Sequence, residues 1–432
     1  MTFLKPTSRP FSHTFALFSR ELVPSLKARD IWNEAAGHPA EPQESFYDST
    51  VQEYAMLPVQ ALSLQQMLEF GYSARQNEEK LLVSARQVQT ELPRRLARRL
   101  LDLQLLPHIV VTRVYDAYFH AFQTLRRQAP IQDVGSNAEF TALLRRLVDE
   151  HAPMLDSLAH GLRECATKPI IGPRLNLDNF LDNMLRSRIS RRVIAEQHIN
   201  LNRPGRDHVG VIATDLSIFD AVGYASQRTR QVCTETYGCT PEIIVSGDVR
   251  ARMPYIPNHL DYMLYELLKN ASRATIEHHQ HPARRRRGSL PPLQVCICEG
   301  SSDVTIRITD RGGGISDDDM QRVWRYGYTT GEHLNKNFER TGSGFGQDMT
   351  SAIDAGQRRF RMAGLGFGLP LSRVYARYFG GDLALKNIPG YGIDAFLHLK
   401  RLEGQDWEEK SDEYSGNLVM ECGLQFNKDV HA

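Results

Sequence analysis

The pattern of glycine and apolar residues changes abruptly near residues 202–205, and this change divides the chain into two regions of different fold class. From about Leu57 to Ile199 glycine is rare, and apolar residues recur every three or four positions. That spacing is typical of amphipathic helices. Four or so long helices predict a bundle, with breaks at Pro107, at 130–137 and at 169–173.

Beyond residue 205 the pattern is that of short strands interrupted by helices. β-rich runs lie at 209–212, 242–245, 293–298, 304–309, 382–386 and 394–399. Strands and helices do not alternate regularly, which disfavours a doubly wound dinucleotide fold. The expected fold class is therefore α+β, a four-helix bundle followed by an α/β sandwich of mixed strand order.

Composition excludes several classes of protein. At roughly 100 to 200 residues per domain, 432 residues predict two or three domains. The 52 basic and 51 acidic side chains leave a net charge of +1, so the chain has no excess charge to hold nucleic acid or an anionic membrane. No apolar stretch approaches the roughly 20 residues of a transmembrane helix. We therefore expect a soluble protein that binds no nucleic acid and does not insert into a membrane.

The six cysteines are scattered, without the repeated pairs of a zinc site or a disulfide framework. Reduced thiols are expected. Cys296 and Cys298 alternate within an apolar run, which predicts two small, buried hydrophobic side chains on one face of a strand.

The N-terminal segment has the composition of an import presequence. Residues 1–20 contain Lys5, Arg9 and Arg20, many Ser and Thr residues and no acid. A disordered tail is the alternative interpretation. Residues 1–45 are expected to form a presequence and a disordered lead.

The helix that follows Pro257 presents two faces. An apolar stripe predicts burial of one face, whereas Glu266, Lys269, Asn270 and Arg273 share the other at the same three-and-four spacing. A solvated polar face with an intrahelical ion pair explains this pattern equally well.

Two glycine segments favour a ligand site instead. The run 304–309 leads into Asp310 and the glycines at 312–314, where the backbone can approach a planar ligand closely. The run 364–368 reads Gly-Leu-Gly-Phe-Gly and opens an apolar helix, so that its amides can cradle an anion. Either run alone is weak evidence of a ligand site. The specific signal is that both runs follow the helix that contains Asn270, with a Gly-rich segment at 331–361 between them.

This ordered set resembles the nucleotide-binding fold shared by DNA gyrase, Hsp90, histidine kinases and MutL. Within it, residues 57–402 most closely resemble the mitochondrial protein kinases of 2-oxoacid dehydrogenase complexes. Further support comes from stretches 90–97, 187–192, 197–198 and 255–257. Stretches 260–262 and 266–270 are similar to the branched-chain kinase, whereas Asp406-Trp407 resembles the cross-dimer Asp-Trp motif of the pyruvate dehydrogenase kinases.

The resemblance implies roles at matching positions. Glu266 corresponds to the general base that accepts the serine proton, and Asn270 to the ligand of Mg²⁺. Asp310 corresponds to the acceptor of the adenine amino group. The implied cofactors are ATP and Mg²⁺, with K⁺ as a further candidate. The implied ATP-binding set is Glu266, Lys269, Asn270, Arg273, Asp310, Gly312, Gly314, Thr329, Thr330, Gly364, Leu365, Gly366, Phe367 and Gly368.

Two positions depart from the family pattern. Tyr262 stands four residues before the base, where the pyruvate branch has histidine. Ile393 replaces the threonine of the usual Gly-x-Gly-Thr-Asp, and the lost hydroxyl would weaken ATP binding by about 1 kcal/mol.

His151, Arg188 and Arg192 lie in segments that resemble the small-acid regulatory pocket of the family. Ion pairs on helix surfaces are the alternative explanation for these charges.

The resemblance implies a serine kinase of the mitochondrial matrix that inactivates a 2-oxoacid dehydrogenase by phosphorylating its α subunit. The tail motif favours the pyruvate complex over the branched-chain complex. The expected partners are that α subunit, the lipoyl domain of the acyltransferase and a second copy of the chain. The expected domains are a docking and regulatory bundle (46–204), the ATP domain (205–402) with a lid at about 331–363, and a tail (403–432).

Three other functions compete. A histidine kinase would need a phosphoacceptor helix, which the bundle region lacks. An ATP-driven clamp would need a transducer domain, but only 30 residues follow Leu402. A noncatalytic scaffold would bind nucleotide without transferring phosphate.

Overall fold

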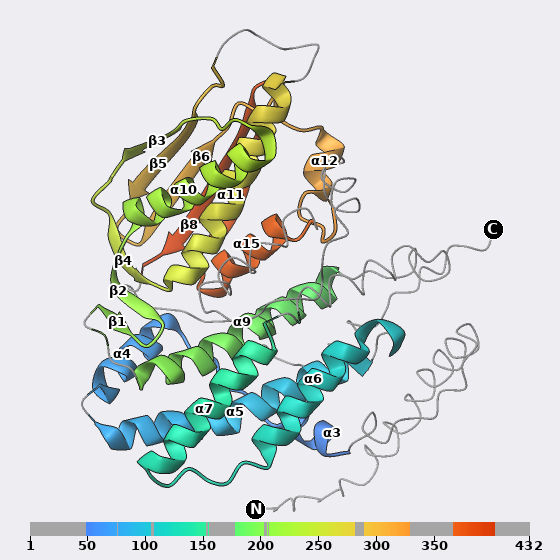
Figure 1. The fold of residues 1–432 in the computed structure, drawn as a ribbon, viewed down its shortest axis with the longest axis vertical. Helices are drawn as coiled ribbons and strands as arrows, with labels where there is room; N and C mark the ends of the chain where they lie inside the picture. Colours follow the sequence, from blue (N-terminus) through green and yellow to red (C-terminus); the bar gives the residue numbers. More distant parts are fainter. Residues whose placement is uncertain are drawn as a thin grey trace, which may run out of the picture.

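The computed structural model describes residues 49–75, 77–104, 108–152, 154, 178–202, 205, 207–280, 289–328 and 366–401. These residues form a helical region and a sheet region that pack against each other (Figure 1). The α+β class is confirmed. None of the described helices is long and apolar enough to cross a membrane.

The helical region is a bundle built around one long central helix. α5 packs against α6, α7 and α9, and fully buried Leu100, Phe122 and Phe140 lie in their shared core. The helices are α3 (Ser49–Met56), α4 (Leu64–Ala74), α5 (Glu78–Gln104), α6 (His108–Arg126), α7 (Val134–Glu150) and α9 (Asp178–Leu201). The helices that were predicted from the three-and-four spacing of apolar residues are therefore present.

The second expected break falls earlier than the sequence predicts, at 127–133 instead of 130–137. α7 begins at Val134 because Asp133 caps it, accepting the Ser136 amide at 2.8 Å in a capping box. The other two predicted breaks, at Pro107 and at 169–173, lie outside the described residues.

A buried histidine joins three helices of the bundle. His198 of α9 is fully buried, with Nδ1 3.0 Å from Ser84 Oγ on α5 and Nε2 3.3 Å from Thr141 Oγ1 on α7. Burial lowers the pKa of His198 to about 4. The folded protein therefore holds this ring neutral at pH values where the unfolded chain protonates it.

Acidification is therefore expected to destabilise the protein through His198. Between pH 6.5 and about 4 the unfolded state binds the extra proton, so stability present above pH 6.5 is lost as the pH falls. The loss from this one group is about 2 kcal/mol at pH 5. Urea unfolding of the wild type and of His198→Gln at several pH values measures it. An identical pH slope in the two proteins would contradict the assignment.

The sheet region has a five-stranded sheet of order β3-β5-β6-β8-β7, in which only β3 and β5 run parallel. α10, α11 and α15 lie on one side of it (Figure 1). The strands are β3 (Ile243–Gly247), β5 (Leu293–Glu299), β6 (Asp303–Thr309), β7 (Asp382–Ile388) and β8 (Gly392–Lys400). The helices are α10 (Ile218–Tyr237), α11 (Pro257–Gln280), α12 (Asp317–Arg322) and α15 (Gly368–Tyr378). The mixed strand order is as predicted.

A small three-stranded sheet lies next to the bundle. It is formed by β1 (His208–Val209), β2 (Ile212–Ser217) and β4 (Arg252–Tyr255), all antiparallel. The prediction of one strand over 209–212 is wrong, because Gly210 adopts a left-handed φ of 62° and turns the chain back on itself.

The expected burial of Cys296 and Cys298 is also wrong. The two side chains do share one face of β5, but Cys296 is half-exposed and Cys298 is exposed. Val295 and Ile297, which alternate with them along the strand, are the buried residues. The apolar core thus covers the other face of this strand.

Candidate active site

The polar face of α11 contains the proposed base in a buried ion pair. Glu266 is 4% exposed, and its Oε1 lies 2.5 Å from Lys269 Nζ. Asn270 and Arg273 follow on the same face and are half-buried. The four residues predicted from the sequence therefore lie together, and the face is not simply solvated. A buried carboxylate such as that of Glu266 can accept a proton from a substrate that binds next to it.

The N-terminus of α15 presses against Glu266. A Cβ atom at Gly368 would lie 2.0 Å from Glu266 Oε2, so a larger residue here would have to displace the carboxylate. Among the described residues, no side chain caps α15 at Phe367. Backbone N–H groups of this first turn can therefore bind an anion beside the base.

Asp310 occupies the second predicted position, directly after β6. It is 6% exposed, and its Oδ1 accepts the amides of Gly312 at 2.8 Å and Ile393 at 3.2 Å. Burial raises the pKa of Asp310, while these two amides oppose the shift. Oδ2 has no partner among the described residues, so one oxygen of a fixed carboxylate is available to a ligand donor.

Glycines let the Asp310 turn pack tightly against its neighbours. A Cβ atom at Gly312 would lie 2.6 Å from Ala274 Cβ on α11, and one at Gly392 would lie 2.1 Å from the carbonyl oxygen of Asp310. Gly314 has a left-handed φ of 71° and contacts Asn387 and Ile388. The turn is therefore held against α11 at Ala274, two turns beyond Glu266.

The site thus has two ends along one helix. Eight residues separate Glu266 from Ala274, a distance of about 12 Å in an α-helix. One end offers uncapped helix amides, Lys269 and a carboxylate, and the other offers a fixed acceptor in the Asp310 turn. A nucleoside triphosphate can bridge such a span with its base at Asp310 and its phosphates near α15.

Gly366 and Phe367 join the site to the bundle. Gly366, with φ 72°, accepts a hydrogen bond from the Gly327 amide at 3.2 Å. The Phe367 side chain is 2% exposed and packs in the bundle core, 5.3 Å from the Tyr326 ring. Only the backbone of Phe367 can therefore face a nucleotide.

Four residues of the predicted ATP-binding set lie outside the described residues: Thr329, Thr330, Gly364 and Leu365. The presequence, the lid and the tail also lie outside them. Their predicted roles stay predictions.

Sequence reasoning noted Tyr262 near Glu266 but missed how this residue packs. Tyr262 is buried one turn before the base, its hydroxyl has no partner among the described residues, and its ring lies 5.2 Å from that of Tyr375 on α15. Burial, followed by the nearby Glu266, raises the pKa of Tyr262 well above its usual value. Tyr375 lies over 100 residues further along the chain, so no spacing rule links the two rings.

The departure at Ile393 gives a testable effect. Because the Ile393 amide binds Asp310 Oδ1, a side-chain hydroxyl at this position would lie beside the proposed adenine acceptor. Ile393→Thr is expected to raise ATP affinity about five-fold, the effect of one added hydrogen bond. Titration calorimetry measures it, with Ile393→Val as the control of equal shape. Equal affinities of the two variants would refute a role for the hydroxyl.

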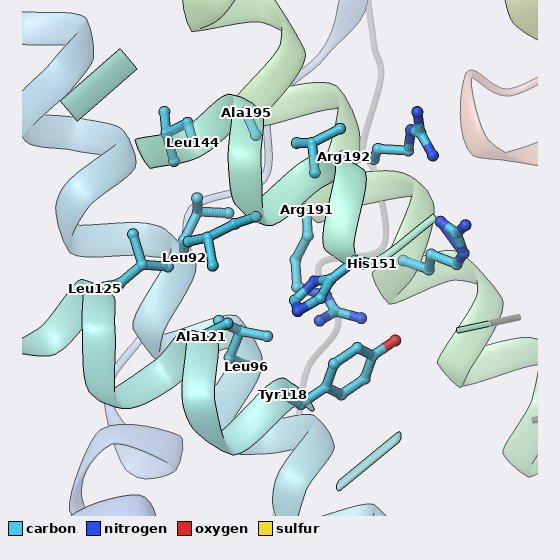
Figure 2. Close-up of a pocket in the computed structure, with 13 residues that line it drawn as sticks. Leu92, Leu96, Tyr118, Ala121, Leu125, Leu144, His151, Arg191, Arg192 and Ala195 are labelled. Carbon is cyan, nitrogen blue, oxygen red and sulfur yellow. The ribbon is translucent and has the colours of Figure 1, made fainter. Parts of the chain in front are cut away.

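A separate pocket lies inside the bundle (Figure 2). Leucines and alanines of α5, α6, α7 and α9 line most of it, and it has no acidic lining residue. The predicted residues His151, Arg188 and Arg192 all line it, together with Arg191 and Tyr118, which the sequence did not single out. They come from three different helical segments, which explains why spacing could not reveal the set.

The charged end of this pocket is electrostatically positive. Arg191 lies over the Tyr118 ring at 4.2 Å, and the His151 ring is 5.2 Å from that of Tyr118. Burial, followed by the charge of Arg191, lowers the pKa of His151 to about 4. Burial alone would raise the pKa of Tyr118, but Arg191 and Arg188 bring it below its usual value. Arg192 is balanced by Glu196 at 2.7 Å.

Comparisons with known proteins match both regions. A family profile described as mitochondrial branched-chain alpha-ketoacid dehydrogenase kinase matches residues 61–213, and one described as histidine kinase-, DNA gyrase B- and HSP90-like ATPase matches residues 255–403.

Curated relatives match over most of the chain. A mitochondrial [pyruvate dehydrogenase (acetyl-transferring)] kinase of Arabidopsis thaliana is 35% identical over 82% of this chain and 93% of its own length. The human isozyme 4 is 32% identical over 83% of this chain and 85% of its own. The rat isozyme 1 is 30% identical over 88% and 86%.

Proposed function

Because this chain belongs to the mitochondrial 2-oxoacid dehydrogenase kinase family, we propose that it is a protein serine kinase of that class. It transfers the γ-phosphate of ATP to a serine of the dehydrogenase α subunit and so inactivates the complex. The single observation that carries the proposal is the buried Glu266 carboxylate held against the uncapped N-terminus of α15. That arrangement supports a proton acceptor beside an anion site.

In this mechanism Glu266 accepts the proton of the attacking serine hydroxyl. Lys269 at 2.5 Å holds the carboxylate in place and compensates its charge. The amides of the first turn of α15 bind the phosphate chain, and Asp310 Oδ2 accepts a hydrogen bond from the amino group of adenine. Phosphoryl transfer depends mainly on positioning and charge compensation, so these residues supply what the protein must contribute.

The donor set fits Mg²⁺. Asn270 lies one turn after Glu266 and offers an amide oxygen, and oxygen donors suit this ion. Phosphate oxygens would supply most of the other ligands, as is usual for Mg²⁺ bound with a nucleotide. Asn270 would hold Mg²⁺, which neutralises phosphate charge when bound. A role for K⁺ stays a prediction.

The substrate complex is proposed to be that of pyruvate dehydrogenase. The curated relatives described above are named for that substrate, whereas the profile over the bundle is named for the branched-chain kinase. Incubating both purified complexes with this protein and ATP, and following each dehydrogenase activity, distinguishes them. Loss of activity in the pyruvate complex is expected. Loss in the branched-chain complex alone would reverse the choice, and loss in neither would favour a scaffold.

The remaining assignments come from the family. The bundle docks the chain on the lipoyl domain of the acyltransferase, the protein acts as a homodimer, and it resides in the mitochondrial matrix. Residues 46–204, 205–402 and 403–432 form the docking bundle, the ATP domain and the tail.

The bundle pocket is proposed to bind a small carboxylic acid that regulates the kinase. Three arginines and a neutral histidine are among the lining residues, and apolar side chains line the rest. The Nε of Arg188 is buried without a partner among the described residues. A carboxylate would satisfy this donor, and a short aliphatic chain would fill the apolar part.

Arg188→Gln is accordingly expected to weaken the binding of a short-chain 2-oxo acid about 10-fold to 100-fold, the effect of one hydrogen bond to a charged group. Titration calorimetry with the purified protein measures it. Arg146→Gln, at an arginine of α7 whose side chain is 63% exposed, is the control. Equal weakening in both variants would exclude Arg188 as a specific contact.

A further inference from the structure

The two cysteines of β5 form a pair that the proposed kinase reaction does not use. Cys296 Sγ and Cys298 Sγ are 3.7 Å apart on the face of the sheet opposite the buried Val295 and Ile297. On the neighbouring strands, Ser246 and Arg307 pair with Cys296, and Thr305 pairs with Cys298. Both thiols are accessible, and both are fixed by a strand that is paired on each side.

Formation of a disulfide is disfavoured by the strand itself. Residues two apart on a strand are about 6.6 Å apart, and their Cβ atoms point the same way at a similar spacing. A disulfide needs Cβ atoms about 3.5–4.5 Å apart. The hydrogen bond with Cys296 and then burial raise the pKa of Cys298, which reduces the thiolate form that oxidants attack. The pair therefore stays a dithiol unless β5 is distorted.

A complete metal site is not available either. A tetrahedral zinc site takes four protein ligands, or three and an open position. The described residues contain no group of three or more His, Cys, Asp or Glu side chains that could hold a metal. The pair offers two sulfur ligands only. A metal or metalloid atom that binds here must therefore already carry its other ligands.

The sulfur separation fits a single bridging atom. Two bonds of about 2.3 Å, the length of zinc–thiolate bonds, hold two sulfurs about 3.8 Å apart at a tetrahedral angle. The observed 3.7 Å is close to this separation, so one thiophilic atom with bonds of similar length can bridge the pair. A thiophilic atom that forms three bonds, one of them to an organic group, needs two thiols to complete its coordination.

We propose that Cys296 and Cys298 form a surface dithiol site that captures trivalent organoarsenic compounds. In the reaction, an arsenic–oxygen double bond is replaced by two arsenic–sulfur bonds. The oxygen leaves as water with the two thiol protons, and no oxidant or reductant takes part. The product is a cyclic dithioarsonite that spans one face of β5.

The test is titration of the full-length protein with phenylarsine oxide, followed by intact-mass measurement and peptide mapping. One phenylarsenic group per chain is expected on the peptide that contains residues 296–298. Cys296→Ser and Cys298→Ser should each weaken capture at least about 100-fold, because one thiol forfeits the chelate effect. Cys239→Ser, at a half-exposed cysteine outside the pair, is the matched control and should change nothing.

A second measurement separates chelation from single-thiol adducts. A small dithiol should release the arsenical from the wild type, whereas the same concentration of a monothiol should not. The proposal is overturned if the arsenic maps to other cysteines, if either serine variant binds as tightly as the wild type, or if the monothiol releases it equally well. Both cysteines lie outside the core, so circular dichroism of the variants should match the wild type.

Discussion

Replacing Glu266 with glutamine is expected to lower the rate of phosphate transfer about 100-fold to 10,000-fold while leaving ATP affinity nearly unchanged. Glutamine keeps the shape of the side chain and still accepts a hydrogen bond from Lys269, 2.5 Å from the carboxylate in the wild type. It cannot take up the proton of the serine hydroxyl. Loss of a general base has an effect of this size.

Two measurements on the same proteins check this result. Single-turnover transfer gives the rate of the chemical step, and titration calorimetry gives ATP affinity. Glu277→Gln is the matched control, because Glu277 lies on the same helix, is exposed and accepts a hydrogen bond from Tyr237. If ATP binding and transfer fell by the same factor in Glu266→Gln, Glu266 would be a binding residue and not the base.

The second large effect is expected at Asp310. In Asp310→Asn the amide oxygen can still accept the Gly312 and Ile393 amides, which leaves an NH₂ group where Oδ2 stood. This donor would face the amino group of adenine, also a donor. Leaving such groups unsatisfied costs about 1–3 kcal/mol, so ATP should bind about 10-fold to 100-fold more weakly.

Nucleotide preference makes this prediction specific. ITP has an oxygen acceptor in place of the adenine amino group, so Asp310→Asn should bind ITP relatively better than the wild type does. Competition of ATP and ITP for the purified variant measures the change. Asp318→Asn, at an exposed residue of α12, is the control. A variant that lost both nucleotides equally would have lost the shape of the site and not its specificity.

The sequence predicted those features that depend on local spacing. The face of α11 with Glu266 and Asn270 follows from helical periodicity, and Asp310 follows from the end of an alternating strand. Each needs only a few neighbouring residues to be recognised. Periodicity also identified the long helices of the bundle.

Features that depend on contacts between distant segments could not be predicted. The approach of Gly368 to Glu266 joins residues about 100 positions apart, and nothing local distinguishes Gly368 from a turn glycine. Phe367 lies in a glycine run, yet its ring belongs to the bundle core. Cys296 and Cys298 looked buried because their neighbours are apolar, but the core covers only one face of β5.

The most direct test of the proposed activity is transfer of labelled γ-phosphate from ATP to the purified pyruvate dehydrogenase complex, by the wild type and by Glu266→Gln. The proposed mechanism predicts label on a serine of the α subunit with the wild type and almost none with the variant, although both bind ATP. Label on a histidine of the kinase chain, or equal labelling of the α subunit by both proteins, would contradict it.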